Sequence, residues 1–318
     1  MNALCRANTA RQMFLVEELR RLLGLLDSAG IPAIPLKGPW LAQRLYGDYT
    51  LRVCADLDLM VPPGGALEAI RLVAAAGYSG ALPERLLTGW LLDHSIEYPL
   101  MRREPAITCG VELHWKLWDA RPSACPATSD MWAEARPSAL FGAPAYALSP
   151  EWEFLYLCIH AAQHQWQSLK WLADINEICC SGGIDWGRVR EKADRFRLTV
   201  VVELTLAACR RLFGAFEGEQ LPAGFRLARL PRGVRLFPAP ESPYAALRRG
   251  LAYSRLMPGV WEKLRCLAEI VFVPELADSQ AVALPVSLSF LYYPLRPLRL
   301  SCKWACVALR QATNSLRG

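Results

Sequence analysis

The segment 56–61 restricts the fold more than any other part of the sequence, because two aspartates alternate there with leucines before an apolar end. Such alternation is typical of a β-strand, in which successive side chains point to opposite faces. Asp56 and Asp58 therefore share one face, while Leu57 and Leu59 enter a core. Two unpaired carboxylates among apolar residues are costly. A bound cation is thus expected beside this pair, and a solvated strand face is the alternative.

The two aspartates have the spacing of a metal site. Their α-carbons lie about 6–7 Å apart in a strand, so both carboxylates can converge on one or two divalent ions. Mg²⁺ is the expected ion, because it prefers oxygen ligands and is completed by substrate phosphates, and Mn²⁺ is the alternative. This arrangement is the one used for in-line displacement at phosphorus.

A third carboxylate comes from the segment 110–115, which also alternates. Glu112 and His114 share one face of this predicted strand, whereas Val111 and Leu113 share the other. If the two strands are neighbours, Glu112 either completes the metal site or accepts the proton of an attacking hydroxyl. An exposed strand position is an equal alternative for Glu112.

A connection upstream of the aspartates has features of a phosphate site. Residues 31–36 predict a short strand, and its prolines favour the edge of a sheet. Gly38 then begins a helix, whose free backbone amides attract anions and whose glycine lets a phosphate approach closely. Lys37 adds positive charge, and Arg52 is a further candidate for binding phosphate. A simple turn and a solvated loop arginine are the alternatives.

Strands and helices are mixed in the first part of the chain, whereas helices dominate the second. In the first part, helices are predicted over 12–29, 38–46 and 66–76, and further strands over 95–101 and 107–115. In the second part, which starts with the helix-capping sequence Ser149-Pro150-Glu151, helices are predicted over 152–164, 169–180, 186–196 and 200–213. A proline-punctuated stretch, 120–148, separates the two parts. We therefore predict an α+β fold with one domain over 1–148 and a helical domain over 149–318.

The composition excludes several classes of protein. With 53% hydrophobic and 21% charged residues, the 318-residue chain has enough apolar material for a full core, which excludes wholesale disorder and collagen. Its 11 cysteines form no C-x-x-C pair, and the N-terminal sequence does not have the pattern of a signal peptide. Free thiols and a cytoplasmic location are therefore expected.

The net charge of +6 is concentrated at the C-terminal end. No acidic residue follows Asp278, whereas five basic residues do: Arg296, Arg299, Lys303, Arg310 and Arg317. This pattern does not match a uniformly basic nucleic-acid binder, so no specific nucleic-acid partner is predicted. The apolar run 281–295 is shorter than the roughly 20 residues of a membrane span. Packing against the helical domain, or weak peripheral contact with anionic lipid, is expected of this tail.

Motifs spread over most of the chain resemble those of one known family. They are Leu36-Lys37-Gly38 followed by Leu41 and Leu45-Tyr46, Arg52 before the segment 56–61, the segment 111–115, the pair His160 and His164, and the segments 169–175 and 291–297. Together they resemble the uncharacterised nucleotidyltransferase family of the DNA polymerase β-like superfamily. Where that superfamily usually has Gly-Gly or Gly-Ser, this sequence has Gly38-Pro39, which removes one backbone donor.

The resemblance implies a small mixed-sheet nucleotidyltransferase domain flanked by helices, followed by a mostly helical domain. It implies an Mg²⁺-dependent transfer of a nucleoside monophosphate from an NTP to an acceptor, with release of pyrophosphate. Asp56 and Asp58 would be metal ligands, Glu112 the third carboxylate, and Gly38 the glycine near the triphosphate.

Two residues of the predicted helical segment are further candidates for contact with the nucleotide. They are His160, for which partial burial is the alternative, and Lys170, for which an ion pair with Asp174 is the alternative. The acceptor is left open among a peptide, a protein and a small molecule. Two other functions also stay open: a tailoring transferase that uses another activated donor, such as a nucleotide sugar, and a non-catalytic module that binds a peptide or protein.

Overall fold

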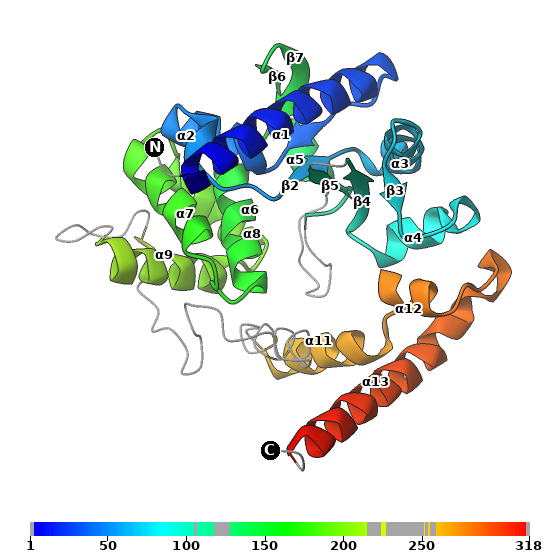
Figure 1. The fold of residues 1–318 in the computed structure, drawn as a ribbon. Helices are drawn as coiled ribbons and strands as arrows, with labels where there is room; N and C mark the ends of the chain where they lie inside the picture. Colours follow the sequence, from blue (N-terminus) through cyan, green and yellow to red (C-terminus); the bar gives the residue numbers. More distant parts are fainter. Residues whose placement is uncertain are drawn as a thin grey trace.

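A five-stranded mixed sheet lies at the centre of the N-terminal part of the molecule (Figure 1). The computed structural model describes residues 3–104, 107–117, 128–214, 224–226, 251, 254 and 259–315. The strands, in their order across the sheet, are β1 (Ile34–Pro35), β2 (Asp56–Met60), β5 (Thr108–His114), β4 (Glu97–Arg103) and β3 (Ser79–Gly80). β2 and β5 are parallel, and the other neighbours are antiparallel. The edge position expected of the proline-containing strand β1 is confirmed.

The two faces of the sheet pack against different helices, because the side chains of β2 alternate. Leu57 and Leu59 belong to a core that also contains the inward side chains of α1 (Ala3–Ser28) and α3 (Ala66–Ala75). Met60, on the opposite face with the two aspartates, belongs to a second core with α2 (Gly38–Tyr46) and the helices that follow residue 149. The acidic face of β2 is therefore turned toward the helical part of the chain.

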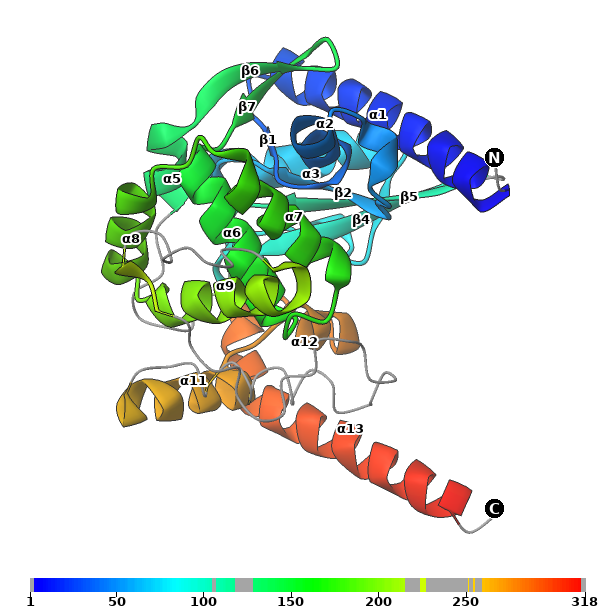
Figure 2. The ribbon, with the colours of Figure 1, turned by 90° about the vertical axis from the view of Figure 1, so that its left-hand side faces the viewer.

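The helical part begins with a group of four helices, as their apolar periodicity predicts, and Figure 2 shows them grouped beside the sheet. They are α6 (Pro150–Gln163), α7 (Leu169–Ser181), α8 (Trp186–Arg195) and α9 (Thr199–Phe213). The Ser149 hydroxyl accepts a hydrogen bond from the Trp152 amide, so the predicted N-cap is confirmed. Because this helical core also includes Ile34, Leu41 and Met60, packing is continuous across the boundary predicted at residues 148 and 149.

Residues 128–148 differ from the connection expected of the stretch 120–148, whose first part, 120–127, lies outside the described residues. Residues 128–134 form helix α5 (Thr128–Glu134), and a hairpin of β6 (Arg136–Leu140) and β7 (Ala143–Ala147) follows. Pro137 and Pro144 do not prevent this pairing, because only alternate amides of an antiparallel strand donate to its partner. Helix α4 (Gly89–His94) was also not predicted.

The C-terminal helices form a smaller unit held together by buried charge. The helices are α11 (Val260–Phe272), α12 (Leu276–Ala281) and α13 (Tyr292–Ser315). The Arg296 guanidinium is 2% exposed and binds Asp278, Glu275 and the Ile270 carbonyl. Arg299 also binds Asp278. Two of the basic residues expected to face lipid thus have their charges paired inside this unit.

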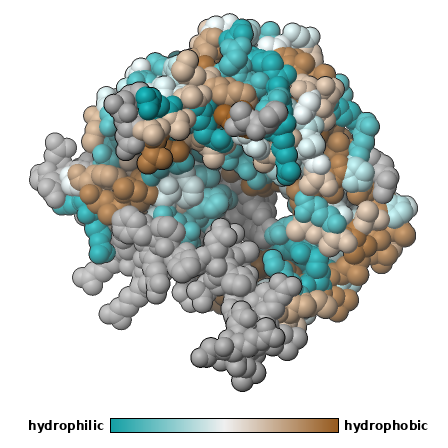
Figure 3. Space-filling model, in the orientation of Figure 1, coloured by the Kyte–Doolittle hydropathy of each residue, from teal (hydrophilic) through white to brown (hydrophobic). Residues whose placement is uncertain are grey.

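Apolar side chains are exposed on the same unit. Figure 3 shows hydrophobic residues gathered at its lower right, near α12 and the 3₁₀-helix η5 (Val286–Leu291). The exposed apolar side chains there include Val282, Val286, Leu288 and Phe290. Among the residues that the structure describes, no helix combines the length and the apolar character needed to cross a membrane.

Helices α2 and α6 are joined by an ion pair whose carboxylate is buried, and this carboxylate makes stability depend on pH. The Glu153 carboxylate contacts the Arg44 guanidinium, and burial outweighs this contact and raises the pKa of Glu153 to about 7. Because the pKa is higher in the folded state, the contribution of Glu153 to stability is complete below about pH 4.5 and is lost as the pH rises through about 7.

We expect the free energy of unfolding of the wild type to fall, relative to that of Glu153→Gln, by on the order of 3 kcal/mol between pH 4.5 and 8. Urea unfolding of both proteins across this range measures the difference. Parallel stability profiles for the two proteins would contradict the prediction.

Candidate active site

A cavity of about 670 Å³ lies beside β2, between the sheet and helices α6 and α7. Eight of the residues that line it are those proposed from the sequence: Lys37, Gly38, Arg52, Asp56, Asp58, Glu112, His160 and Lys170. The first and the last of them, Lys37 and Lys170, are more than a hundred residues apart in the chain. The structure therefore brings all of these side chains to one hollow, whose polar lining suits a charged ligand.

The carboxylates of β2 and β5 lie side by side because the two strands are parallel neighbours. In their register Asp58 is opposite Glu112, and Asp56 is opposite Gly110. The Asp58 side chain is buried, whereas Asp56 and Glu112 are half-buried at the cavity. Two rigid strands thus hold at least two carboxylates close together, as the alternation in each segment predicts.

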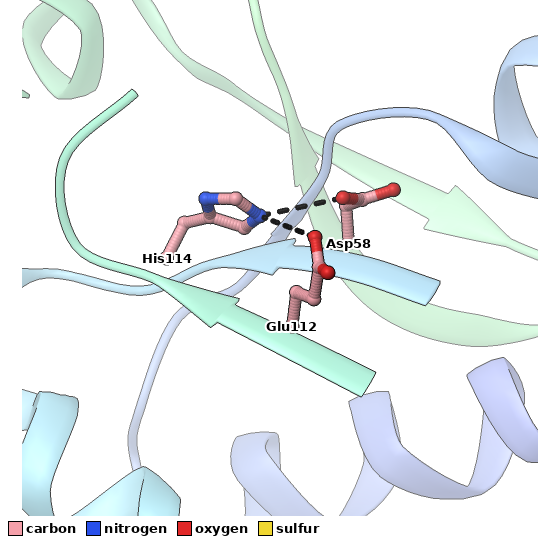
Figure 4. A group of neighbouring side chains, drawn as sticks. All are labelled: Asp58, Glu112 and His114. Atoms are coloured by element: carbon pink, nitrogen blue, oxygen red, sulfur yellow. Dashed lines mark hydrogen bonds and ion pairs between the residues drawn. The ribbon is translucent and has the colours of Figure 1, made fainter. Parts of the chain in front are cut away.

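His114 joins this pair, and sequence reasoning did not propose it as a site residue. Figure 4 shows one nitrogen of its ring pointing toward both carboxylates. The Nε2 atom is 3.3 Å from Asp58 Oδ1 and 3.8 Å from Glu112 Oε2. The ligand atoms of Asp58, Glu112 and His114 all lie within 4.8 Å of one another. The position of His114, two residues after Glu112 on the same strand face, was the signal that could have identified it.

A fourth carboxylate lies on the other side of the imidazole ring. Glu97, at the start of β4, is opposite His114 in the register of β4 and β5. Its Oε2 atom is 3.1 Å from His114 Nδ1. Sequence analysis placed Glu97 within a predicted strand but gave no way to pair that strand with β5.

The turn between β1 and α2 supplies the positive charge that contacts this cluster. Lys37 Nζ is 3.0 Å from Asp58 Oδ1. Gly38 has a φ of +72°, a conformation that favours glycine, and begins α2 with no side-chain cap on the helix. The first-turn amides of α2 are therefore not satisfied by a capping side chain, although Pro39 contributes no donor.

The charges of the site shift one another's pKa values. Burial alone would raise the pKa of Asp58, but Lys37 and His114 outweigh it and hold that pKa far below its usual range. Burial, together with the neighbouring Glu97 and Asp58, raises the pKa of Glu112 to about 8. Burial and the adjacent Asp58 also raise the pKa of Asp56. The raised pKa values of Asp56 and Glu112 show that Lys37 and His114 do not fully offset the acidic groups gathered here.

Arg52 and Lys170 are both engaged by protein groups at the rim of the cavity. Arg52 is 5% exposed, and its Nε donates to both carboxylate oxygens of Asp174, at 3.2 and 2.9 Å. Lys170 Nζ donates to the Val53 carbonyl at 2.9 Å. The ion pair considered between Lys170 and Asp174 is thus replaced by the Arg52–Asp174 pair. A phosphate contact by either cation stays a prediction.

An aromatic wall closes the side of the cavity formed by α6 and α7. Both nitrogens of the His160 ring lie 3.5 Å from Lys37 Nζ, and the ring contacts those of His164 and Trp171. Burial and the positive charge of Lys37 lower the pKa of His160 well below its usual value. A neutral imidazole therefore lies beside the ammonium group.

The donor set at the centre of the cavity fits a divalent cation. Two carboxylates and one imidazole converge there from neighbouring strands, and Asp56 adds a further carboxylate at the cavity. Acidic groups that raise one another's pKa values give up their protons when a cation binds among them, which favours a divalent ion here. Such a centre beside a helix N-terminus and a lysine can hold a polyphosphate and neutralise charge at a reacting phosphorus.

Two solved structures share similarity with the chain. One is that of the antibiotic-resistance factor ANT(2'')-Ia, with 19% identity and a TM-score of 0.39, over 65% of this chain and 97% of the other. The second is an antigenic nucleotidyltransferase-like protein from Paracoccidioides brasiliensis, with 17% identity and a TM-score of 0.38, over 62% of this chain and 92% of the other. No curated protein sequence matches the chain.

A family model gives the assignment. The model described as uncharacterised nucleotidyltransferase matches residues 1–214, about two thirds of the chain, including every residue proposed for the site. The resemblance drawn from the motifs and the expected α+β fold class are thereby confirmed. The chain belongs to the uncharacterised nucleotidyltransferase family.

Proposed function

We propose that the protein transfers a nucleoside monophosphate from an NTP to a hydroxyl or phosphate of an acceptor, with release of pyrophosphate. The observation that carries this proposal is the convergence of Asp58 and Glu112 on one cavity with Lys37 and the N-terminus of α2. Carboxylates and a phosphate-binding helix end are the two components that the reaction requires. The family assignment supports the same class of chemistry.

A divalent ion, Mg²⁺ or Mn²⁺, would be held by Asp58 and Glu112, whereas Asp56, the other ligand expected from the sequence, lies outside the group whose ligand atoms converge. When bound, it would neutralise charge on the phosphates and polarise the α-phosphorus. Lys37 and the free amides of α2 bind the phosphate oxygens and orient the triphosphate. His160 and Trp171 line the wall where the rest of the nucleotide lies.

The transfer step forms one bond and breaks one at the α-phosphorus. An acceptor oxygen attacks, the bond between the α-phosphorus and its bridging oxygen breaks, and pyrophosphate leaves with the electron pair. When the acceptor is a hydroxyl, its proton passes to a cavity carboxylate; we assign Asp56, which lies outside the Asp58–Glu112–His114 cluster. Positioning and charge neutralisation supply most of the rate enhancement.

The proposal is tested by incubating the protein with each α-labelled NTP, Mg²⁺ or Mn²⁺, and fractionated host lysate. We expect pyrophosphate release and transfer of the label to a lysate component with at least one NTP. A matched control is Glu68→Gln, which changes an exposed carboxylate of α3 outside the cavity and keeps full transfer.

Absence of label transfer from every NTP would contradict the proposal. Transfer of a glycosyl group from a nucleotide sugar, with no transfer from NTPs, would contradict it as well and would identify the alternative donor.

A further inference from the structure

The imidazole of His114 lies among the expected metal ligands, and a role for it in metal binding rests on the metal-dependent transfer proposed above. The side chain is almost fully buried, yet its Nε2 atom is at the cavity, 3.3 Å from Asp58 Oδ1 and 3.8 Å from Glu112 Oε2. Figure 4 shows this nitrogen directed at both carboxylates from the end of the same strand that carries Glu112. The ligand atoms of the three side chains all lie within 4.8 Å of one another.

Glu97 lies at the second nitrogen of the imidazole ring, as a charge partner without hydrogen-bond geometry. Its carboxylate is 3.1 Å from His114 Nδ1, on the side of the ring away from Asp58. In metal sites a carboxylate commonly supports a histidine ligand at the ring nitrogen that does not bind the metal, and Glu97 is placed for that role. The pairing is built into the sheet, because Glu97 and His114 are opposite each other in β4 and β5.

The alternative role of His114 is to neutralise Asp58, and Lys37 already does this. Lys37 Nζ contacts the same oxygen of Asp58 at 3.0 Å, shorter than the contact from the imidazole. The Asp58 carboxylate therefore keeps a positive partner in Lys37 when the imidazole is neutral. Glu112, in contrast, forms no ion pair with a lysine or an arginine among the described residues. Its contact with His114 spans 3.8 Å.

We infer that His114 Nε2 is a metal ligand together with Asp58 and Glu112, and that this mixed nitrogen and oxygen set selects a first-row transition ion over Mg²⁺. Mg²⁺ takes oxygen ligands almost exclusively. Imidazole nitrogen is a ligand of first-row transition ions, and Mn²⁺ is the member of that series that also accepts carboxylates readily.

The experiment uses the full chain without nucleotide and Mn²⁺ as the probe. Pulsed electron paramagnetic resonance of bound Mn²⁺ is expected to show coupling to ¹⁴N in the wild type and none in His114→Gln. His160→Gln, which removes the other histidine near Lys37, is expected to keep the coupling. Calorimetry measures the affinity for each ion. The wild type should bind Mn²⁺ at least tenfold more tightly than Mg²⁺. The substitution His114→Gln should weaken Mn²⁺ binding at least tenfold and Mg²⁺ binding less than threefold.

Bound Mn²⁺ without ¹⁴N coupling in the wild type would overturn the inference. So would a wild type that does not bind Mn²⁺, or a His114→Gln variant in which the affinities for Mn²⁺ and Mg²⁺ fall equally. If His114→Gln fails to fold, the wild-type spectrum decides alone. The proposed function is judged separately: label transfer without ¹⁴N coupling contradicts only the ligand assignment, whereas ¹⁴N coupling without transfer from any NTP contradicts only the function.

Discussion

Asp58→Asn is expected to lower kcat/KM for nucleotidyl transfer by about a thousandfold or more. Asp58 is the residue on which the site depends most, because its Oδ1 atom contacts both Lys37 and His114, and its carboxylate is adjacent to Glu112. The amide keeps the shape of the side chain but removes the negative charge that a divalent ion requires. Label transfer from the NTP identified as the donor measures the loss.

The substitution should lower the affinity for the metal as well as the rate. A circular dichroism spectrum distinguishes this loss from a misfolded protein. We expect Asp58→Asn to keep the circular dichroism spectrum of the wild type and to lose Mn²⁺ binding. Asp56→Asn, two residues earlier on the same strand face, is expected to lower the rate while retaining Mn²⁺. More than a tenth of wild-type activity in folded Asp58→Asn would contradict the central role of this carboxylate.

The residues of the site that could be predicted from the sequence are those whose position follows from local alternation. Asp56, Asp58 and Glu112 were placed on strand faces by a period of two, and the structure has those faces toward one cavity. His114 obeys the same rule, but sequence alone gave no reason to separate it from a buried core histidine. The ligand role inferred for it depends on its contacts with Asp58 and Glu112, which the pairing of β2 with β5 creates.

Long-range pairing explains the rest of what the sequence did not reveal. The helices from α6 to α9 were predicted because apolar periodicity is a local property. The parallel pairing of β2 with β5, the β6–β7 hairpin and the Arg52–Asp174 pair each join segments whose sequences carry no mark of their partners. Arg52 is an example: its proximity to Asp56 in sequence suggested a phosphate contact, but a carboxylate 122 residues away already binds it.

Asp174→Asn is expected to lower the free energy of unfolding by about 3–5 kcal/mol. Arg52 and Asp174 are both buried, and the Tyr46 hydroxyl donates to the same carboxylate at 2.9 Å. The pair therefore ties α7 to α2 and to the loop before β2. Removing the negative charge leaves the Arg52 guanidinium buried without a counter-ion, and chemical denaturation measures the cost.

A double variant separates the structural role of this pair from a role in binding the nucleotide. Replacing both charges by apolar groups of similar size, as in Arg52→Met with Asp174→Leu, removes the unpaired charge and is expected to recover most of the lost stability. If Arg52 also contacts phosphate, the double variant will be stable and yet show a raised KM for the NTP. Recovery of both stability and KM would show that Arg52 acts on the cavity only through the packing that it holds. A double variant as unstable as Asp174→Asn would contradict the unpaired charge as the cause, because the variant has no charge left to bury.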